Sequence, residues 1–263
     1  MPDLNSILIV GCGNMGGAML AGWLAAGRDP AGFVVVDPLL GEAPAGVTLL
    51  RELPSGKFDA ILLGIKPQGF ADLALALEPL VGPETTLLSL LAGMDLATLT
   101  ARFPRAGAVV RIMPNLAAAL GKSPLALAGN VSERAAIDAM LSPLGAPEWF
   151  ADDRLFDALT ALVGSGPAFV YRFLDALGHA AAELGIAPAQ AQRLALATVE
   201  GAAALAAESD QSPADLAARV TSAGGTTAAG LAVLDADDAL ARLISATLRA
   251  ARDRGSELAH DFA

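Results

Sequence analysis

The chain begins with a strand pattern that runs directly into a glycine-rich turn and then a helix pattern, and this arrangement constrains the fold most strongly. After Ser6, residues 7–10 are apolar and mostly β-branched, so residues 6–10 are predicted to form a buried strand, and residues 15–26 have a helical pattern. The turn has the spacing G-x-G-x-x-G and consists of Gly11, Cys12, Gly13, Asn14, Met15 and Gly16. Glycines at these three places allow a tight turn, close approach of a ligand to the backbone, and close packing of helix on strand. The pattern predicts a dinucleotide whose pyrophosphate lies at the helix N-terminus; the alternative is a turn that binds no ligand.

The same stretch raises a membrane alternative, because residues 4–27 contain no charged side chain. That length is enough to span a bilayer or to form the core of a signal peptide. Only Asp3 precedes it, so the positively charged start of a signal peptide is absent. Four glycines and Asn14 would also weaken a lipid-facing helix. We therefore expect a cytoplasmic protein with no membrane partner.

Apolar runs alternate with helical patterns through the first half of the chain. Strands are expected at residues 6–10, 33–37, 58–65, 85–91, 108–112, 125–128 and 148–150, and helices at residues 15–26, 70–80, 96–103 and 133–144. Near-continuous apolar strands separated by helices predict a mostly parallel sheet covered on both faces. We expect an α/β Rossmann-type dinucleotide-binding domain over residues 1–152, followed by an all-helical domain over residues 153–263.

The helical half is rich in alanine and leucine and has little polar surface for a unit that stands alone. Two interpretations are equally open. Either this half completes its core against a second subunit, or it forms a tightly packed bundle by itself.

Composition excludes several classes of function. The 263 residues include 17 basic and 28 acidic side chains, a net charge of −11, which argues against a nucleic-acid partner. The single cysteine, Cys12, excludes a disulfide framework and every zinc site built on several cysteines.

An acidic residue, Asp37, ends the second expected strand, where a carboxylate holds the adenosine ribose in dinucleotide-binding domains. A carboxylate there favours NADH, because it repels the 2′-phosphate of NADPH. The alternative is that Asp37 is only a turn residue before Pro38. The expected cofactor is therefore NADPH or NADH, and Asp37 favours NADH.

Three further strand ends carry candidate cofactor contacts, because ligands of open α/β sheets bind at the carboxyl ends of the strands. Ile65, Lys66 and Pro67 follow the third expected strand. Lys66 is placed to reach a phosphate or a ribose; the alternative is a solvated lysine beside a turn. Ala92 lies in the segment after the next strand, which we expect to touch the nicotinamide. Asn115 follows a proline that stops a strand, and we expect its amide donor and acceptor to lie over the cleft.

A second glycine-rich helix start lies in the helical half, at residues 220–227. Hydroxyl residues in the first turn and the helix N-terminus suit a small carboxylate; the alternative is an ordinary capped helix after a loop. His179 and His260 have no partners at metal-ligand spacing, so no metal is expected. No strong general acid stands out, which favours a substrate that already carries its proton, such as an imine.

Five segments, taken in order, resemble the pyrroline-5-carboxylate reductase family, the enzymes of the last step of proline synthesis. They are residues 11–16, 65–68, 111–115, 164–168 and 220–235. The resemblance implies that the helical domain is a dimerisation domain that interlocks in a homodimer, and in this family such dimers often form larger assemblies. It also implies hydride transfer from NADPH or NADH to the C=N of L-1-pyrroline-5-carboxylate, which gives L-proline.

The resemblance also assigns the substrate residues. It places the substrate between the nicotinamide and residues 222–227, a loop that includes Thr226. Backbone N–H groups of Ser222, Gly224 and Gly225 would hold the substrate carboxylate, and the hydroxyl of the catalytic residue, Thr227, would hydrogen-bond the ring nitrogen. One polarising donor is enough, because a protonated C=N is already a strong electrophile.

The chain departs from the family pattern at three places. Ala223 stands where a proline is usual, Leu116-Ala117 where Thr-Pro is common, and Val163 where a serine is common. These departures keep two alternatives open, which are the reduction of a related cyclic imine and a dinucleotide sensor without turnover. A β-hydroxyacid dehydrogenase is excluded, because it needs a catalytic lysine and residues 152–263 contain none.

Overall fold

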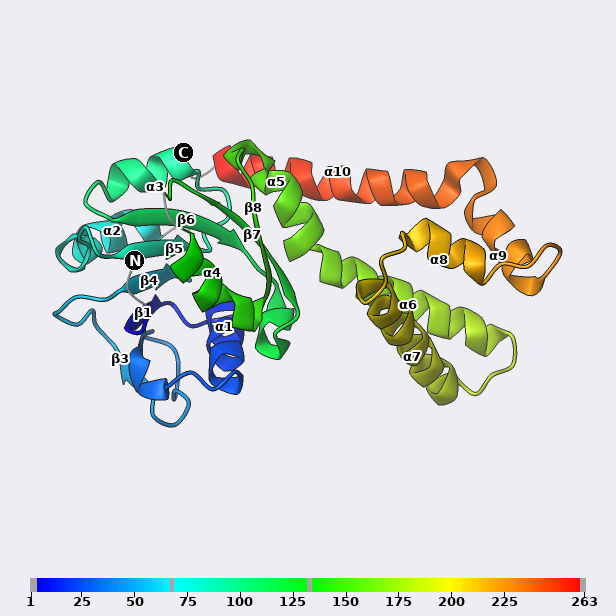
Figure 1. The fold of residues 1–263 in the computed structure, drawn as a ribbon, viewed down its shortest axis with the longest axis horizontal. Coiled ribbons are helices and arrows are strands. Elements are labelled where there is room, and N and C mark those ends of the chain that lie inside the picture. The colour runs from blue at the N-terminus through cyan, green and yellow to red at the C-terminus, as the bar shows by residue number, and fades with distance from the viewer. Residues whose placement is uncertain (1–3, 67–68, 132–133, 261–263) are drawn as a thin grey trace. The chain divides into compact units, whose positions relative to one another are not determined.

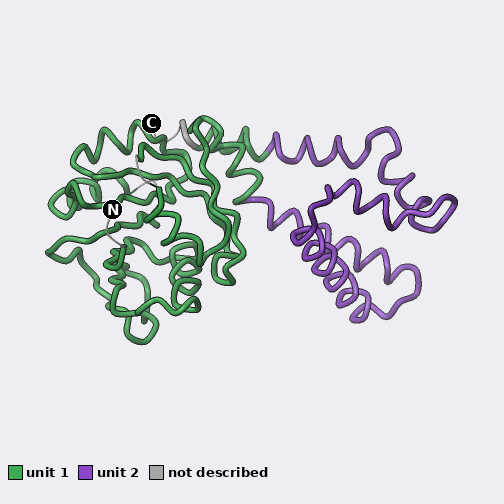
Figure 2. Tube along the Cα trace, in the orientation of Figure 1, with its two compact units in different colours: residues 1–164, 251–263 green, residues 165–250 purple. Residues whose placement is uncertain are grey.

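The computed structural model describes residues 4–66, 69–131 and 134–260. Contacts within the chain divide it into two compact units, which are residues 1–164 with 251–263, and residues 165–250 (Figure 2). The first unit holds the sheet, and the second is helical. The domain boundary between residues 152 and 153 that the sequence favours stays a prediction.

Eight strands among the described residues form one sheet in the order β3-β2-β1-β4-β5-β6-β7-β8. Their bounds are β1 Ile7–Val10, β2 Phe33–Val36, β3 Thr48–Leu50, β4 Ala60–Leu63, β5 Thr86–Ser89, β6 Ala108–Met113, β7 Ser123–Gly129 and β8 Gly145–Trp149. Strands β1 to β6 are parallel, β7 is antiparallel to β6, and β8 is parallel to β7. The predicted mostly parallel sheet is confirmed.

Helices cover both faces of this sheet (Figure 1). The helices of the first unit are α1 (Asn14–Ala25), α2 (Phe70–Leu77), α3 (Leu96–Arg102), α4 (Ala135–Leu141) and α5 (Phe156–Leu159), with the end of α10 (Ala239–His260). Side chains of α1 and α4 belong to one apolar cluster, and those of α2 and α3 belong to the cluster on the opposite face. The sheet is therefore the middle layer of three.

Strand β1 shows why the sheet must be covered twice. Ile7 and Ile9 lie in the cluster with α1, whereas Leu8 and Val10 lie in the cluster with α2. None of the four is more than 3% exposed. Because successive side chains of a strand point to opposite faces, an all-apolar strand is stable only between two layers.

One strand of the structure, β3, was not predicted from the sequence. It has only three residues, sits at the edge of the sheet, and is partly exposed, so it lacks a long apolar run. The predicted 70–80 helix is shorter than expected, because α2 passes into a 3₁₀ turn at Glu78–Leu80. A 3₁₀ turn at Ser142–Leu144 likewise follows α4.

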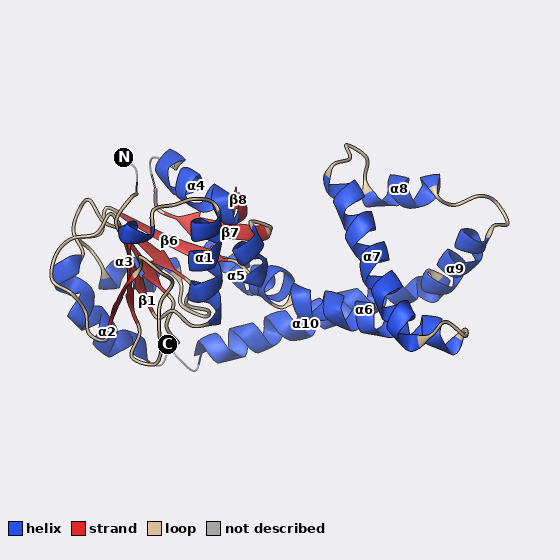
Figure 3. Ribbon diagram, turned by 90° about the horizontal axis from the view of Figure 1, so that it is seen from below, coloured by secondary structure: helices blue, strands red, loops and turns tan. Residues whose placement is uncertain are grey.

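The second unit contains helices and loops only over residues 165–250, all of which the structure describes (Figure 3). Its helices are α6 (Gly166–Glu183), α7 (Pro188–Ala207), α8 (Pro213–Arg219), α9 (Thr226–Leu234) and the start of α10. The predicted all-helical second half is confirmed. Among the described residues of the whole chain, none of the helices combines the length and the apolar character needed to cross a bilayer.

Candidate active site

The candidate cofactor site lies where the strand order reverses, between β1 and β4. The chain leaves β1 toward α1 and leaves β4 toward α2, on opposite faces of the sheet. The two loops separate there, and backbone bonds hold their first residues, from Gly11 N–H to Val36 O (2.9 Å) and from Gly64 N–H to Val10 O (2.8 Å). Ligands of open α/β sheets bind in the crevice at such a switch point.

The three glycines of the first loop meet three different constraints. Gly11 has φ +85°, and a Cβ there would lie 2.9 Å from the carbonyl of Gly64. A Cβ at Gly16 would lie 2.7 Å from Gly11 O, so α1 packs on β1 only without a side chain. A Cβ at Gly13 would meet no described atom within 4 Å. Gly13 therefore borders open space at the N-terminus of α1, and no side chain caps that helix, which fits a pyrophosphate.

Asp37 is fixed by three backbone donors. Its Oδ2 accepts from the N–H of Cys12 (2.8 Å), and its Oδ1 accepts from the N–H groups of Leu39 (2.8 Å) and Leu40 (3.1 Å). Burial alone would raise the pKa of Asp37, but these hydrogen bonds and the charge of Arg51 hold that pKa below its ordinary value. The residue is thus a turn residue whose carboxylate also touches the glycine loop, so both interpretations of Asp37 stand.

A cavity of about 610 Å³ lies beside Asp37 at the carboxyl ends of the strands. Gly11, Ile65 and Lys66 line it, as three of the predicted cofactor residues, and Lys66 is exposed. Pro67 lies outside the described residues. Arg51 also lines the cavity. It was not predicted as a site residue from the sequence, because it follows β3, a strand that was not predicted. The guanidinium of Arg51 donates to the carbonyl of Asp37 at 2.8 Å and so braces the same turn.

Two other predicted contacts differ in their surroundings. Ala92 is exposed in the loop after β5, as a cofactor contact requires. Asn115 is only 8% exposed; its Nδ2 donates to Val163 O (3.2 Å) and its Oδ1 accepts from the N–H of Ala117 (3.0 Å). The expectation that both amide groups lie over the cleft is wrong, because Asn115 caps the 3₁₀ helix Leu116–Leu120. Its role in cofactor binding stays a prediction.

Cys12 is a buried, unpaired thiol within the glycine loop. Burial, and then the nearby charge of Asp37, raise the pKa of this thiol. It is therefore protonated at neutral pH and packs as a small apolar side chain. Among the described residues, no three potential metal ligands lie together.

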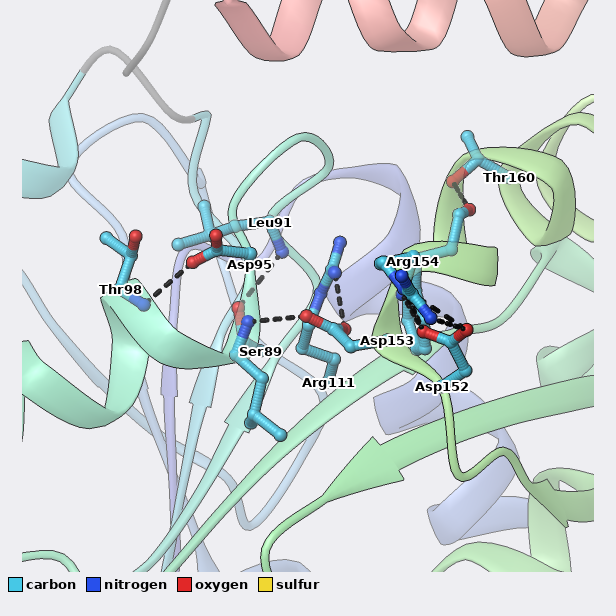
Figure 4. Close-up of polar contacts among 11 residues, drawn as sticks. Ser89, Leu91, Asp95, Thr98, Arg111, Asp152, Asp153, Arg154 and Thr160 are labelled. Carbon is cyan, nitrogen blue, oxygen red and sulfur yellow. Dashed lines mark hydrogen bonds and ion pairs between the residues drawn. The ribbon is translucent and has the colours of Figure 1, made fainter.

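A half-buried ion pair, which was not predicted from the sequence, lies at the ends of β5 and β6 (Figure 4). Arg111 is 5% exposed, and its Nη1 donates to Oδ1 of Asp153 at 2.6 Å. The other oxygen of Asp153 accepts from the backbone N–H of Leu96 at 2.8 Å. The Arg111 guanidinium also lies 4.1 Å from the ring centre of Phe156. A sequence pattern gives no sign of such a pair, because Arg111 and Asp153 are 42 residues apart.

The second glycine-rich helix start lies within the second unit. Gly224 has φ +70°, and the N–H of Gly225 donates to Ser222 O at 3.0 Å, so the loop turns tightly before α9 begins at Thr226. A Cβ at Gly225 would lie 2.5 Å from Ser222 Oγ. No described residue hydrogen-bonds to the hydroxyl of Thr227, which therefore stays available to a ligand.

Comparisons with known proteins identify the family. The family model for pyrroline-5-carboxylate reductase dimerisation matches residues 153–258. A pyrroline-5-carboxylate reductase of Pseudomonas aeruginosa is 34% identical over 97% of this chain and 97% of its own length. The chain belongs to the pyrroline-5-carboxylate reductase family.

Other members agree over the whole length. Pyrroline-5-carboxylate reductase 3 of Danio rerio is 33% identical over 98% of this chain and 93% of its own. The structure of a pyrroline-5-carboxylate reductase from Coxiella burnetii is similar with a TM-score of 0.88 at 28% identity, covering 97% of this chain and 99% of that one. The expected family, fold class, enzyme class and NAD(P)H cofactor class are confirmed, and this reductase forms a homo-oligomer.

Proposed function

We propose that this chain reduces L-1-pyrroline-5-carboxylate to L-proline with NADH or NADPH, the last step of proline synthesis. The observation that carries the proposal is the pair of glycine-rich helix starts in a member of this reductase family. One, at Gly13, borders open space beside a cavity, and the other presents the available hydroxyl of Thr227. A dinucleotide and a small carboxylate are the ligands that such helix starts accept.

The first unit carries the residues for the cofactor. The N–H groups of Gly11 and Cys12 are engaged by Val36 O and Asp37 Oδ2, so those of residues 13–16 would hold the pyrophosphate. Asp37 and Lys66, beside the cavity, would face the adenosine half. Ile65, Pro67, Ala92 and Asn115 complete the proposed contacts. When bound, NAD(P)H supplies a hydride to the imine carbon.

The second unit carries the residues for the substrate. The N–H of Gly225 is engaged in the turn with Ser222, so in this loop the N–H groups of Ser222 and Gly224 and the first turn of α9 are better placed to hold the carboxylate. Thr226 lies in that first turn. The Thr227 hydroxyl would hydrogen-bond the ring nitrogen. Since the substrate arrives with its imine protonated, hydride addition leaves a neutral amine and needs no separate acid.

We also propose that the homo-oligomer is a dimer that assembles further, formed through the second unit. Within residues 165–250 only Gly178, Ala191 and Ala195 are buried, whereas large apolar side chains such as Tyr171 and Leu243 are 65% and 64% exposed. Exposed apolar surface on that scale favours a second copy over a bundle that stands alone. A cytoplasmic location belongs to the same proposal, and the one cysteine, unpaired and buried, fits a reducing compartment.

The proposal is tested with NADH or NADPH that carries deuterium at C4 of the nicotinamide. The position of the deuterium in the product is then determined. We expect one deuterium at the former imine carbon of L-proline, seen by mass spectrometry and chiral chromatography. If deuterium is transferred only when the six-membered homologue of the proposed substrate is supplied, a related cyclic imine is favoured as substrate. Tight cofactor binding without any transfer would favour a sensor without turnover.

A further inference from the structure

We propose that Arg111 and Asp153 are positioning residues that fix the loop after β5, and with it the nicotinamide half of the cofactor site. We call Arg111, Asp153 and the backbone N–H of Leu96 the Arg111 clasp. The inference rests on the proposed function only in placing a nicotinamide at this loop.

The position of the loop follows from the topology. The glycine loop and Asp37 follow β1 and β2, so they belong to the half of the sheet that takes the adenosine and the pyrophosphate. A dinucleotide crosses the switch point between β1 and β4, and its second nucleotide therefore lies over the carboxyl ends of β4 to β6. Residues 90–95 connect β5 to α3 at that edge.

Two side chains fasten this loop at its two ends (Figure 4). At the start, the hydroxyl of Ser89 accepts from the N–H of Leu91 at 3.3 Å. At the finish, Oδ2 of Asp153 accepts from the N–H of Leu96 at 2.8 Å. Arg111 connects the two ends, because it pairs with Ser89 in the sheet register and holds Oδ1 of Asp153 at 2.6 Å.

Between its two ends, the loop alternates between buried and exposed residues. Gly93 has φ +79°, and Leu91 and Met94 on either side are 3% and 9% exposed. Ala92 and Asp95 are the exposed residues of this loop, and Ala92 lies at its turn next to Gly93. A shift of the end near Leu96 would move Ala92, since the loop has no helix or strand of its own.

The charge of Arg111 also reaches a second acidic group of the same loop, Asp95, which hydrogen-bonds to Thr98. The carboxylate of Asp95 accepts from Thr98 N–H at 2.7 Å and so caps α3. The pKa of Asp95 lies below its ordinary value, first through the hydrogen bonds from Thr98 and also through the positive charge of Arg111. The charge of Arg111 thus acts on both carboxylates that bind N–H groups of the first turn of α3, on Asp153 by direct contact and on Asp95 at longer range.

Stability alone does not explain why the pair is ionic. Even a fully buried ion pair is often replaced by apolar side chains of similar size without loss of stability, and Asp153 is only partly buried. An apolar pair cannot, however, accept a backbone N–H with one atom while holding a partner with another. The carboxylate of Asp153 does both, which makes position rather than stability the property that the pair supplies.

The test compares, on the full-length protein, the binding of complete dinucleotides with that of a ligand that lacks the nicotinamide. Isothermal titration measures the Kd of NADPH and NADH, and the Kd of ADP-ribose, which lacks the nicotinamide. In Asp153→Ala we expect the dinucleotides to bind about tenfold more weakly, whereas ADP-ribose stays within about twofold of the original value. Asp138→Ala is the matched control, because Asp138 is a half-buried carboxylate of the same unit that accepts from Trp149 Nε1 at 2.7 Å and bonds no residue of the loop. It should leave all affinities unchanged.

Three further variants separate loss of the clasp from loss of the folded structure. Asp153→Asn keeps an oxygen for Leu96 N–H and replaces the alanine variant if that one does not fold. Arg111→Lys keeps the charge and should retain more dinucleotide affinity than Arg111→Met. Equal losses for dinucleotide and ADP-ribose, or no loss for either, would overturn the clasp. If the unaltered protein binds neither ligand, the proposed function itself fails.

Discussion

The carboxylate of Asp37 and the backbone N–H of Cys12 are joined by a hydrogen bond of 2.8 Å. The acidic residue at the end of β2 and the first turn of the glycine loop are therefore fixed to each other before any cofactor binds. The N–H groups of Leu39 and Leu40 hold the other carboxylate oxygen. The chain thus presents a fixed negative charge beside the cavity of the cofactor site.

That charge should govern the choice between the two cofactors. We expect Asp37→Ser to raise kcat/KM for NADPH relative to NADH by about tenfold or more, because a like charge next to the 2′-phosphate is removed. Asp29→Ser is the matched control, since Asp29 also receives a backbone N–H but precedes β2. An unchanged ratio in the Asp37 variant would remove Asp37 from the ribose site.

The same hydrogen bonds predict how stability depends on pH. The folded pKa of Asp37 is lowered, although burial alone would raise it, so its contribution is fully present above the ordinary aspartate pKa of about 3.9 and is lost as pH falls through the lower folded value. Urea unfolding should show the protein more stable than Asp37→Asn by a constant amount from pH 7 to pH 5. The difference should shrink below about pH 4. A difference that grows toward acid pH would contradict this sign.

Two glycine variants separate folding from ligand binding. Gly16→Ala should lower the free energy of unfolding by about 1–3 kcal/mol, because its Cβ would lie 2.7 Å from Gly11 O. Gly13→Ala meets no described atom within 4 Å and should unfold much as the original protein does. It should still weaken cofactor binding, because its methyl group would occupy the space of the pyrophosphate. Chemical denaturation and titration with NADPH measure the two effects, and a Gly13→Ala protein with full affinity would be inconsistent with the proposed pyrophosphate position.

The sequence predicted the parts of this molecule that depend on local pattern. The strand, turn and helix of residues 6–26 are visible because apolar periodicity and glycine spacing are local properties, and the parallel sheet follows from repeating them. Strand β3 was missed because three partly exposed residues at a sheet edge carry no such pattern. Arg51 follows this strand and lines the cavity, and it was therefore not predicted as a site residue either.

Side-chain direction was the harder part to predict. Asn115 was expected over the cleft, but it caps the turn that follows it and donates to Val163, which lies 48 residues away. Arg111 and Asp153 meet only because β6 and the segment before α5 are brought together by the fold. Contacts of this kind depend on tertiary structure, and spacing along the chain does not encode them.

The hydroxyl of Thr227 should contribute directly to turnover. We expect Thr227→Val to lower kcat by about ten- to a thousandfold, as the loss of one hydrogen bond to the reacting group in the transition state does. Thr198→Val is the control within the same unit, because the Thr198 hydroxyl only donates to Leu194 O in its own helix. Steady-state kinetics with saturating cofactor measure both variants, and equal kcat values for them would end the assigned role of Thr227.

The most direct test of the account is the oxidation of NADH and of NADPH by the purified protein with L-1-pyrroline-5-carboxylate, followed at 340 nm in parallel reactions. We expect turnover with both cofactors, a higher kcat/KM for NADH because of Asp37, and L-proline as the product. A folded protein that binds either cofactor but oxidises neither in the presence of this substrate would contradict the central claim.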